Sequence, residues 1–243
     1  MFRYLSVVFL FTITIFASDG LHINAAIGYP FSFDNQLELK YNDKVHKFNA
    51  EYEPKAFSDF PYWTLRTEYW RKDQALGIEL VHHKLYWKNK SADVENFSVS
   101  DGYNLLYLNY AKKIQDHRFR IGVGAVFGNP DFKLKGRDRY LKRHLKGMHW
   151  GGYTAQVAYE RCLYESDRFY INFETKLTYS FAKLPISDKL NEYAKVPDTA
   201  IHFNIGFGTK PLKSKSSLKD KALYISPILL PNLLYALQAH TVE

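Results

Sequence analysis

Residues 169–181 alternate between apolar and polar side chains with a period of two. The odd positions are apolar except for Thr175, and the even positions carry polar groups. Successive side chains of a β-strand point to opposite faces, so this segment is predicted to be a strand with one apolar face. A tilted strand needs about 9–11 residues to cross a bilayer, and this run is long enough. A soluble sandwich can also contain such a strand, so the rest of the chain has to decide.

The same alternation recurs along the chain and predicts ten strands, at residues 21–29, 36–41, 45–52, 62–71, 76–87, 103–112, 118–127, 153–161, 169–181 and 199–208. From residue 42 onward, short connections rich in turn residues alternate with long ones. The long connections are residues 88–102, 128–152 and 183–198. We therefore predict an all-β fold, an antiparallel up-and-down transmembrane β-barrel of ten strands, with both termini at the short turns. The alternative is eight strands, with residues 36–52 as an extended loop.

The first eighteen residues have the organisation of a secretory signal peptide. Arg3 precedes an apolar run at residues 5–16, and Ala17 offers a small residue for cleavage. The run is shorter than the roughly 20 residues of a membrane-spanning helix. We expect a leader at residues 1–18 that is cleaved near Ala17, a barrel at residues 19–209 and a tail at residues 210–243. The alternative for the leader is an anchor that stays attached.

The composition agrees with alternating strands. Aromatic residues make up 17% of the chain, and yet the mean hydropathy is negative. Each strand of a membrane barrel contributes one apolar and one polar face, which produces this combination. Cys162 is the only cysteine, which argues against a disulfide-stapled secreted scaffold. We expect it to be a lipid-facing or packed small residue.

The chain resembles the small bacterial outer-membrane β-barrel proteins in its leader, its strand pattern and the asymmetry of its connections. The resemblance covers roughly residues 21–208. The resemblance implies a bacterial outer-membrane location, insertion by the barrel-assembly machinery and, here, a monomer. Members of this class typically end on an aromatic residue, whereas this chain ends at Glu243. We expect the tail to be a docked or periplasmic appendage. An extra strand or an interfacial helix is the alternative, with Pro227 and Pro231 arguing against one long helix.

The polar faces of the predicted strands carry charges of both signs that would point into the barrel. Enclosed charges must pair or keep water, and barrels of about eight strands are filled by side chains. We therefore favour a plug of ion pairs over the alternative, a narrow pore with a charged constriction. The predicted lumen residues are Arg66, Glu68, Glu79, Arg120, Glu160, Glu174 and Lys176, with Glu51 as a further candidate.

One cluster has the residue types of a hydrolase. His82 and His83 lie on one predicted strand, and Ser100 and Asp101 lie at the outer start of its partner. Some barrels of the resembling class modify lipid A, and a base beside a hydroxyl or an activated water would meet that requirement. This gives the alternative function of a lipid A hydrolase or acyltransferase. Adjacent histidines on a strand point to opposite faces, so we predict no metal site, and nothing in the sequence indicates a cofactor.

A basic segment lies in one of the long connections. Its cations suit the phosphates of lipopolysaccharide, and the net charge of +8 fits such a partner. Nucleic acid is the competing explanation of the charge, and the leader argues against it. We therefore expect a barrel with a structural or interaction role that presents basic outer loops to lipopolysaccharide or an external partner. The predicted phosphate-binding residues are Lys133, Lys135, Arg137, Arg139, Lys142 and Arg143.

Overall fold

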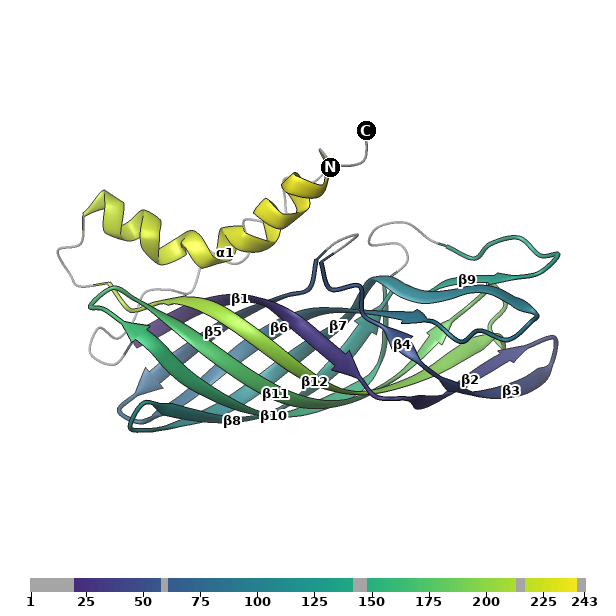
Figure 1. The fold of residues 1–243 in the computed structure, drawn as a ribbon, viewed down its shortest axis with the longest axis horizontal. Helices are drawn as coiled ribbons and strands as arrows, with labels where there is room; N and C mark the ends of the chain where they lie inside the picture. The colour runs from purple at the N-terminus through teal and green to yellow at the C-terminus, as the bar shows by residue number, and fades with distance from the viewer. Residues whose placement is uncertain (1–19, 58–60, 142–147, 213–216, 240–243) are drawn as a thin grey trace.

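Eight strands close a ring in the computed structural model, which describes residues 20–57, 61–141, 148–212 and 217–239 (Figure 1). Each strand pairs antiparallel with the next, and the last pairs back with the first. The prediction of an antiparallel up-and-down barrel is confirmed, and the predicted leader lies outside the described residues. The ring consists of β1 (Gly20–Ser32), β5 (Trp63–Arg71), β6 (Gln74–Trp87), β7 (Val94–Ile114), β8 (His117–Gly128), β10 (His149–Glu165), β11 (Phe169–Pro185) and β12 (Tyr193–Thr209).

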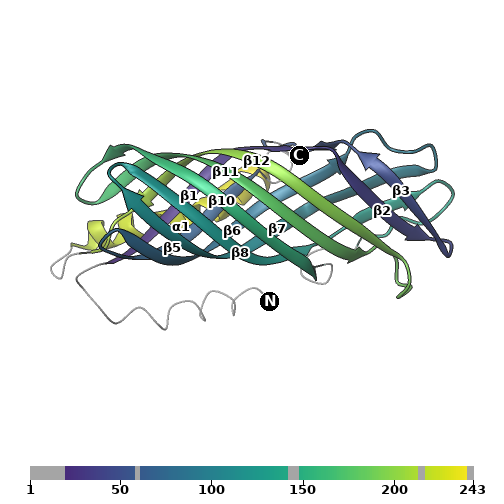
Figure 2. The same cartoon turned by 90° about the horizontal axis from the view of Figure 1, so that it is seen from below.

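The prediction of ten ring strands is wrong, because the hairpin at residues 35–50 extends the sheet without entering the ring. β2 (Asn35–Tyr41) pairs with the first residues of β12, and β3 (Lys44–Ala50) pairs with β2. Two short strands lengthen the same end: β4 (Tyr52–Glu53) pairs with β6, and β9 (Asp131–Leu134) pairs with β7. We call this end of the molecule the extended end, and the opposite end the short-turn end (Figure 2).

The turns explain why the connections differ in length at the two ends. Lys72 and Gln115 adopt φ of 55° in tight turns at the short-turn end. Asn42 and Asp43 both have positive φ, as a two-residue type I′ hairpin requires. Their turn lies at the tip of the extended end, because β2 continues outward from the start of β12. The predicted alternation of short and long connections therefore fails at residues 42–44.

The strands invert their polarity along their length. On β11, Glu174 is buried inside the ring, while Leu177 is exposed on the outer wall. Beyond Phe181 the faces exchange character, since Leu184 is fully buried inside and Lys183 is exposed outside. β12 follows the same rule, with buried Ala194 and Val196 beside outward Lys195. We call this change, between Phe181 and Lys183 on β11, the polarity inversion.

The extended end has a hydrophobic core of its own. Burial of each large apolar side chain contributes roughly 1.5–3 kcal/mol, so this end is stabilised in the way a soluble sheet is. Its long connections are therefore largely sheet rather than loop, which the predicted boundaries at residues 88–102 and 183–198 missed. The larger members of this core are Leu37, Leu39, Trp87, Phe97, Val99, Tyr103, Leu105, Phe132, Leu184, Ile186 and Val196.

The described part of the tail forms helix α1 (Leu218–Ala239), which includes both Pro227 and Pro231. The expectation that these prolines prevent one long helix is wrong. α1 lies outside the ring against β1, β12 and β5 (Figure 1). In the described part of the chain, no helix has the length and apolarity needed to cross a membrane.

Candidate functional site

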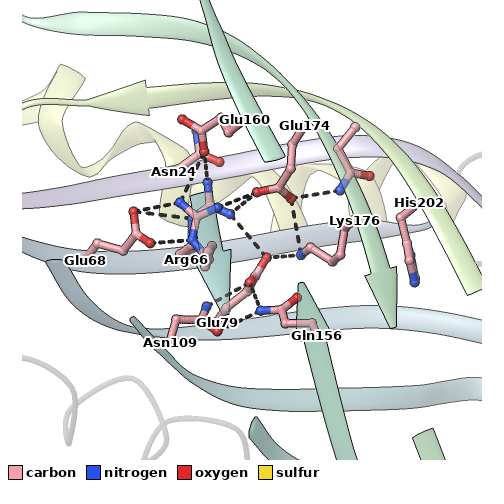
Figure 3. Close-up of polar contacts among 12 residues, drawn as sticks. Asn24, Arg66, Glu68, Glu79, Asn109, Gln156, Glu160, Glu174, Lys176 and His202 are labelled. Carbon is pink, nitrogen blue, oxygen red and sulfur yellow. Dashed lines mark hydrogen bonds and ion pairs between the residues drawn. The ribbon is translucent and has the colours of Figure 1, made fainter. Parts of the chain in front are cut away.

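Arg66 lies at the centre of a buried charge network inside the ring (Figure 3). Its guanidinium group lies 2.5 Å from Glu160 Oε2 and 2.5 Å from Glu174 Oε2. A second guanidinium, that of Arg120, lies 2.6 Å from Glu68 Oε1 and 2.7 Å from Glu174 Oε2. These side chains come from β5, β8, β10 and β11, so the network ties distant parts of the ring together.

Glu79 and Lys176 extend the network across the ring. The Lys176 ammonium group contacts Glu79 and lies 3.3 Å from Glu174 Oε1. The side-chain amides of Asn109 and Gln156 donate hydrogen bonds to Glu79 Oε2 over 3.0 and 2.8 Å. Each carboxylate therefore has several donors, as a buried charge requires.

The structure brings all seven predicted lumen residues into this network and adds Arg118, whose Nη1 lies 2.6 Å from Glu160 Oε1. Arg118 was missed because it stands at the first position of a predicted strand, although it shares the parity of Arg120. Glu51 is not a lumen residue, because it lies between β3 and β4, half-exposed, 3.7 Å from Lys88. The network thus holds four carboxylates and four cations, and its charges balance: Glu68, Glu79, Glu160 and Glu174 with Arg66, Arg118, Arg120 and Lys176.

His83 faces the lumen between the charge network and the hydrophobic core. Its Nε2 lies 3.2 Å from Asp198 Oδ2 and 3.4 Å from Ser32 Oγ. A catalytic triad uses both ring nitrogens, one toward the acid and one toward the hydroxyl. Here the acid and the hydroxyl share one nitrogen, and His83 is fully buried, so the arrangement lacks the geometry of a triad.

The other predicted catalytic residues lie elsewhere. His82 is on the opposite face of β6, where its ring stacks on Trp63 and its Nδ1 lies 2.8 Å from Asn104 Oδ1. The register pairs His83 with Tyr103 and Leu85 with Val99, so Ser100 and Asp101 fall in the bulge between these pairs. The catalytic assignment of these residues stays a prediction. Within the described residues, no group of three or more His, Cys, Asp or Glu side chains could hold a metal ion.

Several cations of the predicted phosphate-binding segment have acidic partners. Lys133 lies 2.5 Å from Glu95, and Arg137 lies 3.7 Å from Glu192. Arg139 forms a two-pronged ion pair with Asp131. Lys142 and Arg143 lie outside the described residues. These contacts compete with any phosphate for the same cations, so this segment is a weaker anion site than its composition indicates.

A different group of lysines gathers just beyond the polarity inversion, around the ring of Tyr193. The ammonium groups of Lys183, Lys195 and Lys40 lie 4.2, 5.6 and 5.9 Å from the ring centroid. Lys183 and Lys195 are register partners on β11 and β12. We call these three lysines the lysine cluster. One carboxylate balances it in part, because Glu38 lies 2.7 Å from Lys195, and that hydrogen bond lowers the pKa of Glu38.

No family model and no curated protein matches the chain. Among solved structures it is similar to Ail, the attachment invasion locus protein of Yersinia pestis, with 14% identity and a TM-score of 0.40, over 79% of this chain and 99% of that one. OprG, an outer-membrane protein of Pseudomonas aeruginosa, has 15% identity and a TM-score of 0.45, over 79% and 96%. The outer-membrane protein AlkL has 13% identity and a TM-score of 0.45, over 84% and 96%. The chain is thus similar in structure to small outer-membrane β-barrel proteins, and this likeness concerns the fold alone.

Proposed function

We propose that this chain is an outer-membrane β-barrel with a filled interior, which binds lipopolysaccharide phosphates at the lysine cluster. A monomeric soluble protein rarely exposes a large apolar patch, whereas here every strand of the ring presents a large exposed apolar or aromatic side chain on its outer wall. Such an apolar band is suited to contact with the hydrocarbon core of a bilayer. Its exposed members include Ile27, Tyr29, Tyr69, Leu76, Ile78, Leu108, Tyr110, Phe119, Ile121, Val123, Tyr153, Val157, Ile171, Leu177, Tyr179, Phe203 and Ile205.

The polarity inversion indicates how deep the barrel would lie in the membrane. Tyr153 and Phe181 stack on the outer wall with ring centroids 5.7 Å apart, and Trp150 is exposed near them. Aromatic side chains of this kind suit the boundary between hydrocarbon and headgroups. Lys183 is the next outward residue after Phe181 on β11. The lysine cluster would then lie at the level of the lipid headgroups.

The register of the cluster is the observation that carries the binding proposal. Like charges directly opposite each other on neighbouring strands are destabilising, and Lys183 faces Lys195 across the β11–β12 pair. Glu38 supplies one negative charge against three ammonium groups. An anion bound over Tyr193 would relieve this repulsion, and a phosphate accepts hydrogen bonds from several ammonium groups at once. Lipopolysaccharide presents phosphates at this depth.

The test compares two double variants that remove the same charge from opposite ends of the barrel. Lys183→Ala/Lys195→Ala should weaken lipopolysaccharide binding about tenfold for each lost lysine, which is ~1.4 kcal/mol apiece. Lys112→Ala/Lys113→Ala, at the short-turn end of β7, should bind as the unmodified protein does. Binding is measured on purified refolded protein with intact and with dephosphorylated lipopolysaccharide.

Two results would overturn the assignment of binding to the lysine cluster. One is equal affinity of both double variants and the unmodified protein. The other is an equal loss in both double variants, which would indicate a general effect of net charge rather than a site. A loss that persists with dephosphorylated lipopolysaccharide would also contradict recognition of phosphate.

A further inference from the structure

Helix α1 begins with a capping box and then carries no charge for most of its length. Ser217 Oγ accepts a hydrogen bond from the Asp220 amide over 3.2 Å, and Asp220 Oδ2 accepts one from the Ser217 amide over 3.0 Å. Asp220 also lies 2.8 Å from Arg168, in the turn between β10 and β11. From residue 222 to residue 239 the sequence has no Asp, Glu, Lys or Arg. The start of the helix is therefore fixed at the short-turn end.

The helix covers part of the outer wall where the first and last strands of the ring meet. Ile23 and Ala25 on β1 are each only 2% exposed, whereas Ile27, further along the same face, is 44% exposed. Tyr224 Oη donates a hydrogen bond to the Leu21 carbonyl over 2.9 Å. Thr209 Oγ1, at the end of β12, donates one to the Tyr224 carbonyl over 2.8 Å. α1 is thus docked on β1 and β12 by specific contacts.

The contacts around Pro227 show how the helix continues through a residue that lacks an amide proton. Pro227 cannot donate to the carbonyl four residues earlier, that of Leu223. Ser226 Oγ donates a hydrogen bond to that carbonyl over 2.7 Å instead. Thr209 Oγ1 donates a hydrogen bond to the next carbonyl, that of Tyr224. Pro227 and Pro231 are themselves buried. The Leu223 carbonyl, which loses its backbone donor at Pro227, is thus satisfied by a hydroxyl group of the helix itself, as hydrocarbon surroundings require.

The face of α1 that points away from the barrel is also largely apolar, with Asn232 as an exposed polar residue on it. Ile225, Ile228, Leu229 and Leu233 are each between 41% and 56% exposed. A helix that is apolar all round is typically buried in protein or in lipid. This face adds to the exposed apolar band of the ring, because α1 packs on β1, where Ile27 is exposed. Acyl chains cover that band if the ring spans a membrane, so the same chains would meet the outer face of the helix.

We infer that α1 is a lipid-embedded helix that crosses the β1–β12 seam, with its outer face covered by acyl chains of the leaflet at the short-turn end. This inference rests on the proposed membrane placement of the ring. The partner surface is hydrocarbon, which fits the absence of Asp, Glu, Lys and Arg from residues 222–239. A second copy of the chain over the same face is the competing arrangement, and the experiment separates the two.

The experiment places a polarity-sensitive fluorophore on single cysteines in a Cys162→Ser background, in phosphatidylcholine vesicles with brominated acyl chains. Ile228→Cys and Leu229→Cys report on the helix, and Val123→Cys on β8, 65% exposed, reports on the ring. Lys189→Cys, in the connection between β11 and β12, is the water-exposed control. Each variant is first checked for the heat-modifiable migration of a folded barrel.

We expect both helix labels to be quenched by the brominated chains to the same extent as the Val123 label, while the Lys189 label is not quenched. Quenching at Val123 without quenching at Ile228 and Leu229 would overturn the helix inference and leave the membrane placement standing. A second copy over the helix would give this result, together with a dependence of the helix signal on protein concentration. Absence of quenching at Val123 would instead overturn the membrane placement itself.

Discussion

Glu174 illustrates how single side chains hold the lumen together. Its two oxygens accept hydrogen bonds from Arg66, Arg120 and the Asn204 amide, and the residue is almost fully buried. Removal of one partner from a buried ion pair leaves an uncompensated charge, which costs far more than the pair contributes when intact. The balance of four carboxylates against four cations is therefore the property on which this charge network depends.

Glu174→Gln removes one negative charge without changing the size of the side chain. We expect the free energy of unfolding to fall by about 3–5 kcal/mol, because Arg66 and Arg120 lose a shared counter-charge. The matched control is Glu95→Gln, whose partially exposed ion pair with Lys133 should contribute only about 0–1 kcal/mol. Urea unfolding in lipid vesicles, followed by gel migration, measures both. Equal effects of the two substitutions would contradict a balanced lumen.

At the scale of elements, the connection between β11 and β12 is organised by one buried carboxylate. Glu192 Oε1 lies 3.4 Å from the Asn42 amide, and 3.7 Å from both Arg137 and Lys189. Burial acts to raise the pKa of Glu192, but hydrogen bonds from Ser187 and Asn42, with the two cations, outweigh it and lower the pKa below its usual 4.5. The ionised carboxylate thus joins the turn after β9, the turn between β2 and β3, and the β11–β12 connection.

The direction of this shift fixes how the connection should respond to acid. A carboxylate with a lowered pKa in the folded state stabilises that state above its ordinary pKa, and this contribution is lost as pH falls through the lowered value. We expect the amide hydrogen-exchange protection factors of residues 186–192 to be constant above pH 5 and to fall below pH 4.5. In Glu192→Gln they should be low throughout and independent of pH. An unmodified protein whose protection stays constant down to pH 3 would contradict this role of Glu192.

At the scale of the whole molecule, the sequence predicts the barrel better than its ends. The alternation at residues 169–181 identifies a strand with one apolar and one polar face. The same alternation places Arg66, Glu79 and Lys176 on the polar faces of their strands, which point into the barrel. Alternation does not show which strands close the ring. The sequence therefore predicts the hairpin at residues 36–52 as two further ring strands. The sequence assigns residues 183–198 to a loop, although Leu184 and Val196 continue the alternation of their strands in the opposite phase.

The tail shows the second limit of local reasoning. Pro227 and Pro231 argue against a helix when only neighbouring residues are considered. Ser226 is local and donates to the Leu223 carbonyl, which Pro227 leaves without its backbone donor. A second contact, from Thr209 to the Tyr224 carbonyl, comes from a residue that no local rule connects to the tail. The lysine cluster was missed for the same reason, because Lys40 joins Lys183 and Lys195 only through the pairing of β2 with β12.

The central claim is that the outer surface of the barrel passes from the hydrocarbon core of the membrane to the level of the headgroups at the polarity inversion. A spin label scanned along the outward positions of β11 in lipid vesicles tests it most directly, with the accessibility of each label to oxygen and to a water-soluble nickel chelate as the measurement. We predict that labels at Ile171, Phe173, Leu177, Tyr179 and Phe181 are accessible to oxygen and shielded from the chelate, and that the order reverses at Lys183. Accessibility to the chelate that is uniform from Ile171 to Lys183 would contradict the account.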